Sequence, residues 1–288
     1  LFGSYRMPIH LPEHATEASK LRAELAERLV QSCPSDLADE IALVGSTARG
    51  YADDDSDLEL NLWAEAIPPL EARIAWLKQV DVSQWVVEEA PRSDDSYWIH
   101  AVIDQINVEL GWQTFAIADR FISTAVSSAA QPPVLIEIVA SAIPLRTMGK
   151  LHDWQATLSA YSNPFQESTV NVAIEEWSRL KHFTAMRRLA QHGERLLLAY
   201  YLIDDLNRAV HLLYASYRRW SPKVKWTLTV AREFAPFDLD ARIDAILGDP
   251  SLKRRVDLCA QFCLEVLALV PKDYDVSKAV EALKQGLG

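Results

Sequence analysis

The stretch IALVGSTARGYADDDSDLELNLW, residues 41–63, decides the fold of the first half of this protein. It begins with four apolar residues, turns at Gly45-Ser46, crosses a loop with three consecutive aspartates, and ends in alternating polar and apolar residues. A short apolar run before a glycine and a strict alternation after a polar loop are both typical of strands. The stretch therefore predicts two strands joined by an acidic loop.

The alternation in the second of these strands separates its side chains into two faces. Leucines occupy every second position, and we expect the opposite face, with Asp57, Glu59 and Asn61, to be open to solvent. Side chains on one face repeat every two residues, so the Cα atoms of Asp57 and Glu59 are about 6 to 7 Å apart. Two carboxylates at this spacing can share a divalent cation, because Mg²⁺ binds a few such oxygens together with water and phosphate.

A third acid is expected on a neighbouring strand. The segment SYWIHAVIDQINVELGWQT, residues 96–114, predicts a hairpin that turns near Asp104-Gln105. Glu109 in its second arm has the same polar, mid-strand position as Glu59, so it could complete a two-metal site or act as a base. Asp104 is the alternative third acid, since it is near in the sequence and the register of a strand can differ by a residue or two from the one that alternation predicts.

The turn between the first two strands offers groups that bind phosphate. Gly45 allows the backbone to approach a phosphate closely, and the Ser46 hydroxyl and nearby N–H groups can bind its oxygens. Arg49 lies near enough in the sequence to assist. Asp53 to Asp55 are expected mainly to cap and solvate the loop.

Together these motifs resemble the signature of nucleotidyltransferases of the DNA polymerase β superfamily. Val44-Gly45-Ser46 is followed by ten residues and then by Asp57-Leu58-Glu59-Leu60, and Val108-Glu109-Leu110 matches the later strand motif of that superfamily. A small catalytic domain with a mixed sheet, followed by a helical domain, is similar to kanamycin nucleotidyltransferase and other aminoglycoside-modifying enzymes.

The resemblance implies that the chain transfers a nucleoside monophosphate from a nucleoside triphosphate to an acceptor hydroxyl and releases pyrophosphate. Asp57 and Glu59 would then hold Mg²⁺ or Mn²⁺, Ser46 and the 45–50 backbone would bind the triphosphate, and Glu109 would bind metal or take the acceptor proton.

Helical patterns dominate after residue 115. They cover about 115–128, 132–142, 150–160, 168–192, 194–219, 223–234 and 250–270. The sequence therefore predicts an α+β protein with an N-terminal mixed-sheet catalytic domain, residues 1–162, and a C-terminal helical bundle for substrate binding, residues 163–288. The break at Ser162-Asn163-Pro164 separates them.

The segment YASYRRWSPKVKW, residues 214–226, mixes four cations with four aromatic residues. It is either a solvated basic face with aromatic core anchors or a contributor to triphosphate or RNA binding, with aromatic rings as stacking surfaces. Lys225 is the candidate here for a contact with the nucleotide.

Charge and composition limit the partners. The net charge of −11 argues against coating nucleic acid, and the acidic residues gather in the first half, where residues 1–169 carry −14 and residues 170–288 carry +3. A small cationic acceptor such as an aminoglycoside is therefore favoured. The alternatives are a tRNA- or protein-modifying, toxin-like transferase and a degenerate nucleotide-binding regulatory protein.

Hydrophobic runs, the N-terminal stretch and the cysteines of this sequence favour a cytoplasmic protein. We find no apolar run of the roughly 18 to 20 residues that a membrane-spanning helix needs, and the N-terminal stretch does not have the pattern of a leader peptide. Cys33, Cys259 and Cys263 are odd in number and lack metal-site spacing, so we expect reduced, structural thiols.

Overall fold

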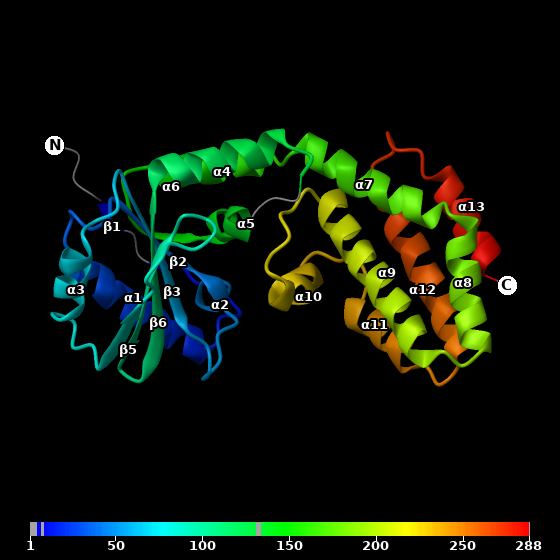
Figure 1. Ribbon diagram of the computed structural model, residues 1–288, viewed down its shortest axis with the longest axis horizontal. Helices are drawn as coiled ribbons and strands as arrows, with labels where there is room; N and C mark the ends of the chain where they lie inside the picture. Colours follow the sequence, from blue (N-terminus) through cyan, green and yellow to red (C-terminus); the bar gives the residue numbers. More distant parts are fainter. Residues whose placement is uncertain (1–4, 7–8, 131–133, 288) are drawn as a thin grey trace. The chain divides into compact units, whose positions relative to one another are not determined.

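The computed structural model describes residues 5–6, 9–130 and 134–287, which form two compact units (Figure 1). The first unit comprises the described parts of Leu1–Thr124 and Leu135–Ala160, and the second those of Ala125–Val134 and Tyr161–Gly288. The first contains a mixed sheet and the second is helical, so the predicted α+β class is confirmed. The division into functional domains 1–162 and 163–288 stays a prediction.

The described strands of the first unit form one seven-stranded sheet. Their order across the sheet is β1 (Tyr5–Arg6), β7 (Ile143–Thr147), β2 (Glu40–Val44), β3 (Leu58–Ala64), β6 (Ile106–Thr114), β5 (Tyr97–Ile103) and β4 (Gln84–Val87). Neighbouring strands are antiparallel except β3 and β6, which are parallel. Parallel partners need a crossover connection, and helix α3 (Leu70–Leu77) begins that connection.

Two helices, α1 (Glu17–Ser32) and α3, cover one face of this sheet (Figure 1). Helix α1 begins directly after Thr16, because the Thr16 side chain accepts a hydrogen bond from the Ser19 backbone N–H. The leucines of β3 and the indole of Trp76 on α3 are buried in the core between helices and sheet. Burial of these apolar groups fixes which face of β3 points away from the helices.

The opposite face of β3 is open to solvent only at its beginning. Glu59 is half-buried, but Asn61 is 7% exposed and Trp63 is completely buried, so the expectation that Asn61 faces solvent was wrong. The Trp63 ring packs edge-on against Trp154 of helix α6 (Lys150–Ser159), with 5.5 Å between ring centroids. This helix begins more than 80 residues after β3 ends. The alternation of residues within β3 therefore could not show that the face around Trp63 is covered.

The hairpin predicted near Asp104-Gln105 is confirmed. Ile103 at the end of β5 pairs with Ile106 at the start of β6, and the two residues between them have φ values of 51° and 65°. Positive φ at both central residues is the geometry of a two-residue turn whose twist matches that of the strands. The turn thereby sets the register of all pairs farther along the hairpin.

Helices account for most of the chain after β6. The described helices are α4 (Phe115–Ser127), α5 (Val134–Ser141), α6, α7 (Asn163–Trp177), α8 (Leu180–Gln191), α9 (Arg195–Ser216), α10 (Val224–Arg232), α11 (Leu239–Gly248), α12 (Leu252–Leu267) and α13 (Ser277–Gly286). The run predicted over 168–192 is interrupted at Ser178-Arg179, and β7, α11 and α13 were not predicted.

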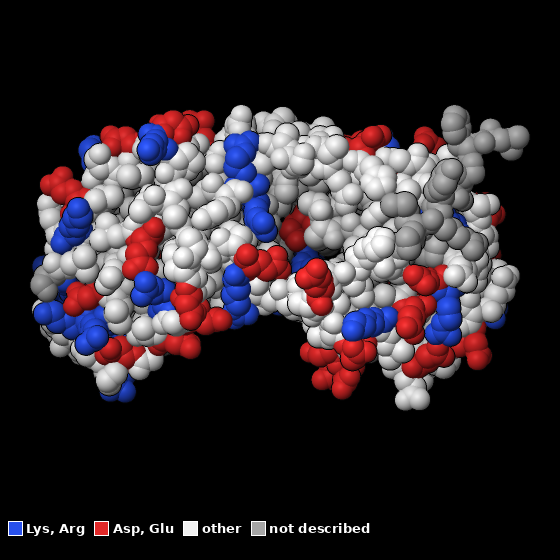
Figure 2. Space-filling model, turned by 180° about the vertical axis from the view of Figure 1, so that it is seen from behind, with Lys and Arg blue, Asp and Glu red and all other residues white. Residues whose placement is uncertain are grey.

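The second unit has its own core, formed mainly by α7, α8, α9 and α12. Its largest fully buried side chains include Trp177, Tyr214 and Phe262. Figure 2 draws one face of this unit at its left. Basic and acidic side chains of the described residues lie next to one another on that face. None of the helices in the described ranges is both long and apolar enough to cross a membrane.

Candidate metal centre

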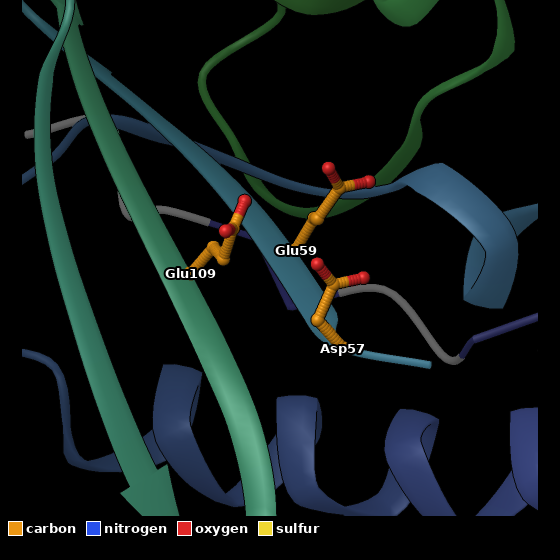
Figure 3. A group of neighbouring side chains, drawn as sticks. All are labelled: Asp57, Glu59 and Glu109. Carbon is orange, nitrogen blue, oxygen red and sulfur yellow. The ribbon is translucent and has the colours of Figure 1, made fainter. Parts of the chain in front are cut away.

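Three carboxylates meet where β3 and β6 lie side by side. Asp57 directly precedes β3, Glu59 is its second residue, and the parallel register pairs Glu59 with Glu109 in the middle of β6. One oxygen of each carboxylate lies within 4.8 Å of the others (Figure 3). Among the described residues, this is the one group of three or more acids, histidines or cysteines with that geometry. The structure thus brings together the three acids that the sequence predicts.

Crowding of like charges changes the proton affinity of the central acid. Burial, followed by the charges of Asp57 and Glu59, raises the pKa of Glu109 above its ordinary value. The charges of His100 and Arg92 partly oppose this increase. A divalent cation between the carboxylates would remove the repulsion, and three hard oxygen ligands suit Mg²⁺ or Mn²⁺. The donor set therefore fits the metal ion that the sequence predicts.

Asp104, the alternative third acid, lies elsewhere in the first unit. It occupies the β5–β6 turn, and its carboxylate forms an exposed ion pair with Arg28 of α1. The group formed by Asp57 and Glu59 includes Glu109 and does not include Asp104. The hairpin register separates these two candidates, because Glu109 is five residues beyond Asp104 along β6.

Gly45 makes room for a carboxylate of the metal centre, a role separate from the phosphate binding that the sequence predicts. It follows β2 at the start of the short helix α2 (Gly45–Ala48) and has a φ of +70°. A Cβ atom at this position would lie 1.7 Å from Oε2 of Glu59, so the glycine leaves the space that the Glu59 carboxylate fills. Ser46 is 5% exposed. The binding of phosphate by Gly45 and Ser46 stays a prediction.

Arg49 has protein partners in place of the expected phosphate. Its guanidinium donates hydrogen bonds to both carboxylate oxygens of Glu137 on α5, to the Ser141 hydroxyl at 3.1 Å and to the Gly45 carbonyl at 3.1 Å. The side chains of Arg49 and Glu137 are 8% and 9% exposed. The ion pair therefore links α2 to α5, and a contact between Arg49 and a triphosphate would require it to open.

The acidic loop is organised as the sequence predicts. The Asp53 carboxylate accepts a hydrogen bond from the Ser56 hydroxyl at 2.6 Å, and this bond lowers the pKa of Asp53. Arg22 of α1 donates to the carbonyl oxygens of Asp54 and Ser56 at 3.0 and 2.8 Å. These contacts hold the loop backbone against α1 and support a structural role for the Asp53 carboxylate.

Several aromatic and basic side chains of the segment 214–226 in the second unit contact other residues of the protein. Tyr214 and Trp220 are 1% and 8% exposed, so these two rings are core anchors and offer no open stacking surface. Arg218 donates to Gln166 at 2.7 Å, and the Arg219 guanidinium lies 4.6 Å from the ring centroid of Phe234. Lys225, exposed on α10, lies 5.6 Å from the centroid of the Trp226 ring. Its proposed contact with a nucleotide stays a prediction.

Sequence reasoning missed a chain of polar residues on the far side of Glu109. His100 pairs with Glu109 across the hairpin; its Nδ1 lies 3.2 Å from Glu109 Oε1 and its Nε2 2.8 Å from Glu88 Oε1. Hydrogen bonds from Arg92 hold the pKa of Glu88 at about 2. The hairpin register contained the signal, because a turn at Asp104-Gln105 places residue 100 opposite residue 109.

A hollow of about 300 Å³ lies beside Glu109 on the same unit. Its lining includes the side chains or backbone of Asp55, Asp57, Gln84, His100, Asn107 and Glu109. Its three carboxylates and two amides share the lining with apolar residues of the sheet, so it suits a ligand that carries hydroxyl or cationic groups beside an apolar part. A group bound there would lie next to the acids of the metal centre.

Comparisons with known proteins leave the family open. Neither a scan against models of protein families nor a search of curated proteins finds a match. Among solved structures, the fold is similar to the crystal structure of a nucleotidyltransferase-like protein from Exiguobacterium sibiricum 255-15, with a TM-score of 0.40 and 15% sequence identity. The similarity covers 91% of this chain and 78% of that protein.

Proposed function

We propose that this protein is a metal-dependent nucleotidyltransferase that moves a nucleoside monophosphate from a nucleoside triphosphate to an acceptor hydroxyl. One observation carries the proposal: Asp57, Glu59 and Glu109 converge from adjacent strands directly beside a Gly-Ser turn. Three carboxylates next to a Gly-Ser turn match what phosphoryl transfer needs, namely groups that can hold metal ions and a backbone turn that can bind a triphosphate.

The chain's own residues would divide the work. Asp57 and Glu59 would hold Mg²⁺ or Mn²⁺, and Glu109 would complete the ligand set or accept the proton of the acceptor hydroxyl. The bound ion would neutralise charge on the triphosphate. The acceptor oxygen forms a bond to the α-phosphorus, the bond to the bridging oxygen breaks, pyrophosphate leaves, and the proton moves to Glu109. A base of this kind contributes about 10²- to 10⁴-fold to the rate.

We propose a small, hydroxyl-bearing and cationic acceptor, such as an aminoglycoside. The hollow beside Glu109 supports this acceptor, since its lining includes three carboxylates and two amides and its volume suits part of a small molecule. The net charge of −11 points the same way. The basic segment around Lys225 favours the second candidate, a tRNA- or protein-modifying transferase.

The test is a labelling experiment with purified protein, Mg²⁺ and each nucleoside triphosphate labelled on its α-phosphate. We expect label on an aminoglycoside and release of pyrophosphate; label on tRNA or on protein would select the second candidate. Absence of label from aminoglycosides, tRNA and protein alike, with each triphosphate and with Mg²⁺ or Mn²⁺, would contradict the transferase and favour a degenerate nucleotide-binding regulator.

A further inference from the structure

The side chain of Glu109 has a neighbour on each side in one row across the sheet. Glu59 of β3 and His100 of β5 are its register partners on the two adjacent strands. Glu59 repels the Glu109 carboxylate, whereas the Nδ1 atom of His100 lies 3.2 Å from its Oε1 oxygen. His100 is therefore the register neighbour that can attract the Glu109 carboxylate, in contrast to the repulsion from Glu59.

The His100 ring is itself held on its other side. Its Nε2 atom lies 2.8 Å from Oε1 of Glu88, so both ring nitrogens contact carboxylate oxygens. Arg92 donates three hydrogen bonds to the Glu88 carboxylate, with distances of 2.6, 3.0 and 3.1 Å. A ring with contacts at both nitrogens has little freedom to rotate about its side-chain bonds.

The row ends in a packed part of the sheet. The Arg92 guanidinium lies 4.1 Å from the centroid of the Trp98 ring, and Trp98 is 9% exposed. That ring fills the space over Gly111, where a Cβ atom would lie 2.6 Å from it. The indole N–H of Trp98 donates to the Ser96 hydroxyl at 2.6 Å. Arg92 and Glu88 are thus supported by residues of the core and not by solvent alone.

We propose that His100, held in place by Glu88 and Arg92, is a positioning residue that orients the Glu109 carboxylate toward the metal centre, a role that rests on the proposed nucleotidyltransferase function. A glutamate has three rotatable side-chain bonds, and Asp57 and Glu59 repel its charge. Without His100, Glu109 turns away from the other two acids in a larger share of molecules. Partners of this kind are worth about 10- to 100-fold in metal affinity or activity.

The experiment measures Mn²⁺ binding to the full chain by electron paramagnetic resonance of free Mn²⁺, together with transfer kinetics at saturating metal. We expect His100→Ala to raise the Kd for Mn²⁺ about tenfold and to lower kcat by about the same factor, with the KM for triphosphate within about twofold of wild type. His100→Asn keeps an N–H donor close to the position of Nδ1, so it should restore most of both losses.

Two further variants complete the design. Glu88→Ala removes the support of the ring and should give a smaller loss in the same direction, which decides the question if His100→Ala unfolds. His152→Ala removes an exposed histidine from α6 of the same unit and should match wild type. Melting temperatures of all variants show whether they are folded.

The outcomes separate the two proposals. A wild-type protein that binds no Mn²⁺ overturns the metal-dependent function and the role of His100 with it. If wild type binds Mn²⁺ and folded His100→Ala binds it equally well with unchanged kcat, only the positioning role is overturned. Equal losses in His100→Asn and His100→Ala also overturn it, because the retained donor then has no effect.

Discussion

Two clusters of charged residues, one in each unit, have opposite electrostatic surroundings. In the helical unit, Asp205 is completely buried, and its carboxylate accepts hydrogen bonds from Trp177, His182 and Arg208 at 2.8 to 2.9 Å. In the sheet unit, Glu109 lies within 4.8 Å of two other acids, and its pKa is raised. One carboxylate is surrounded by donors, whereas the other faces two like charges on one side.

The difference separates charges that stabilise a fold from charges that stabilise a ligand. A buried carboxylate surrounded by donors contributes to the native state as it stands, and its removal leaves those donors unsatisfied. A cluster of like charges costs free energy until a cation binds, so the fold retains it at the expense of stability. Each prediction below tests one side of this comparison.

The largest effect is expected at the sheet unit. Asp57→Asn removes a metal ligand without changing the size of the side chain, so transfer activity should fall about 10³-fold while the melting temperature stays near that of wild type. Asp54→Asn, in the same acidic loop, is the matched control and should retain activity. Transfer by Asp57→Asn at the wild-type rate would remove Asp57 from the mechanism.

The largest loss of stability is expected in the helical unit. Asp205→Ala leaves the guanidinium of Arg208 and the ring of His182 without their buried acceptor, so the free energy of unfolding of this unit should fall by about 3 to 5 kcal/mol. Asp204→Ala removes a partner of the same arginine, but Asp204 is 46% exposed, and the loss should stay below about 1 kcal/mol. Urea unfolding followed by tryptophan fluorescence measures both; equal losses would contradict the distinction.

Gly45→Ala tests whether the missing side chain at position 45 serves the metal centre. The added Cβ would displace the Glu59 carboxylate and the residue would keep an unfavourable positive φ, so we expect both weaker Mn²⁺ binding and a stability loss of about 1 to 3 kcal/mol. Gly193→Ala provides the control, because Gly193 has a φ of +73° and open space at its Cβ position. If the two variants bind Mn²⁺ equally well, the glycine does not serve Glu59.

The effect of Glu109→Gln on stability should change sign when metal is added. In metal-free protein at neutral pH, ionised Glu109 opposes folding because its pKa is higher in the folded state than in the unfolded chain. The variant should therefore melt at a higher temperature than wild type in chelator. This advantage should shrink as the pH falls through the raised pKa toward the ordinary value. Saturating Mn²⁺ should stabilise wild type more; a variant that melts lower in chelator would contradict the repulsion.

The smallest effect concerns Lys225. If this exposed lysine contacts the triphosphate, Lys225→Ala should raise the KM for triphosphate a few fold, about the effect of one screened charge, and leave kcat unchanged. Lys223→Ala, two residues earlier, reports the effect of removing a neighbouring charge. An unchanged KM in Lys225→Ala would make the lysine a solvated surface residue.

The sequence predicted those parts of the fold and site that depend on local geometry. The alternation around Glu59 and the turn at Asp104-Gln105 are set by neighbours within a few residues, so the acid pair and the hairpin followed from the sequence. Asn61 was wrongly expected to face solvent because alternation within β3 does not show that distant segments cover this face, as Trp154 of α6 does at Trp63. The ion pair of Arg49 with Glu137 likewise joins residues 88 positions apart.

By itself, the sequence determined which side chains share a strand face, since that depends only on a period of two residues and on turn geometry. Only the tertiary structure decided which of these faces meet. The parallel pairing of β3 with β6 places Glu59 beside Glu109, and the hairpin adds His100 on the other side. Strand pairing over long separations is decided by burial of whole faces, and the same burial gives Asp205 its donors while it leaves Glu109 among acids.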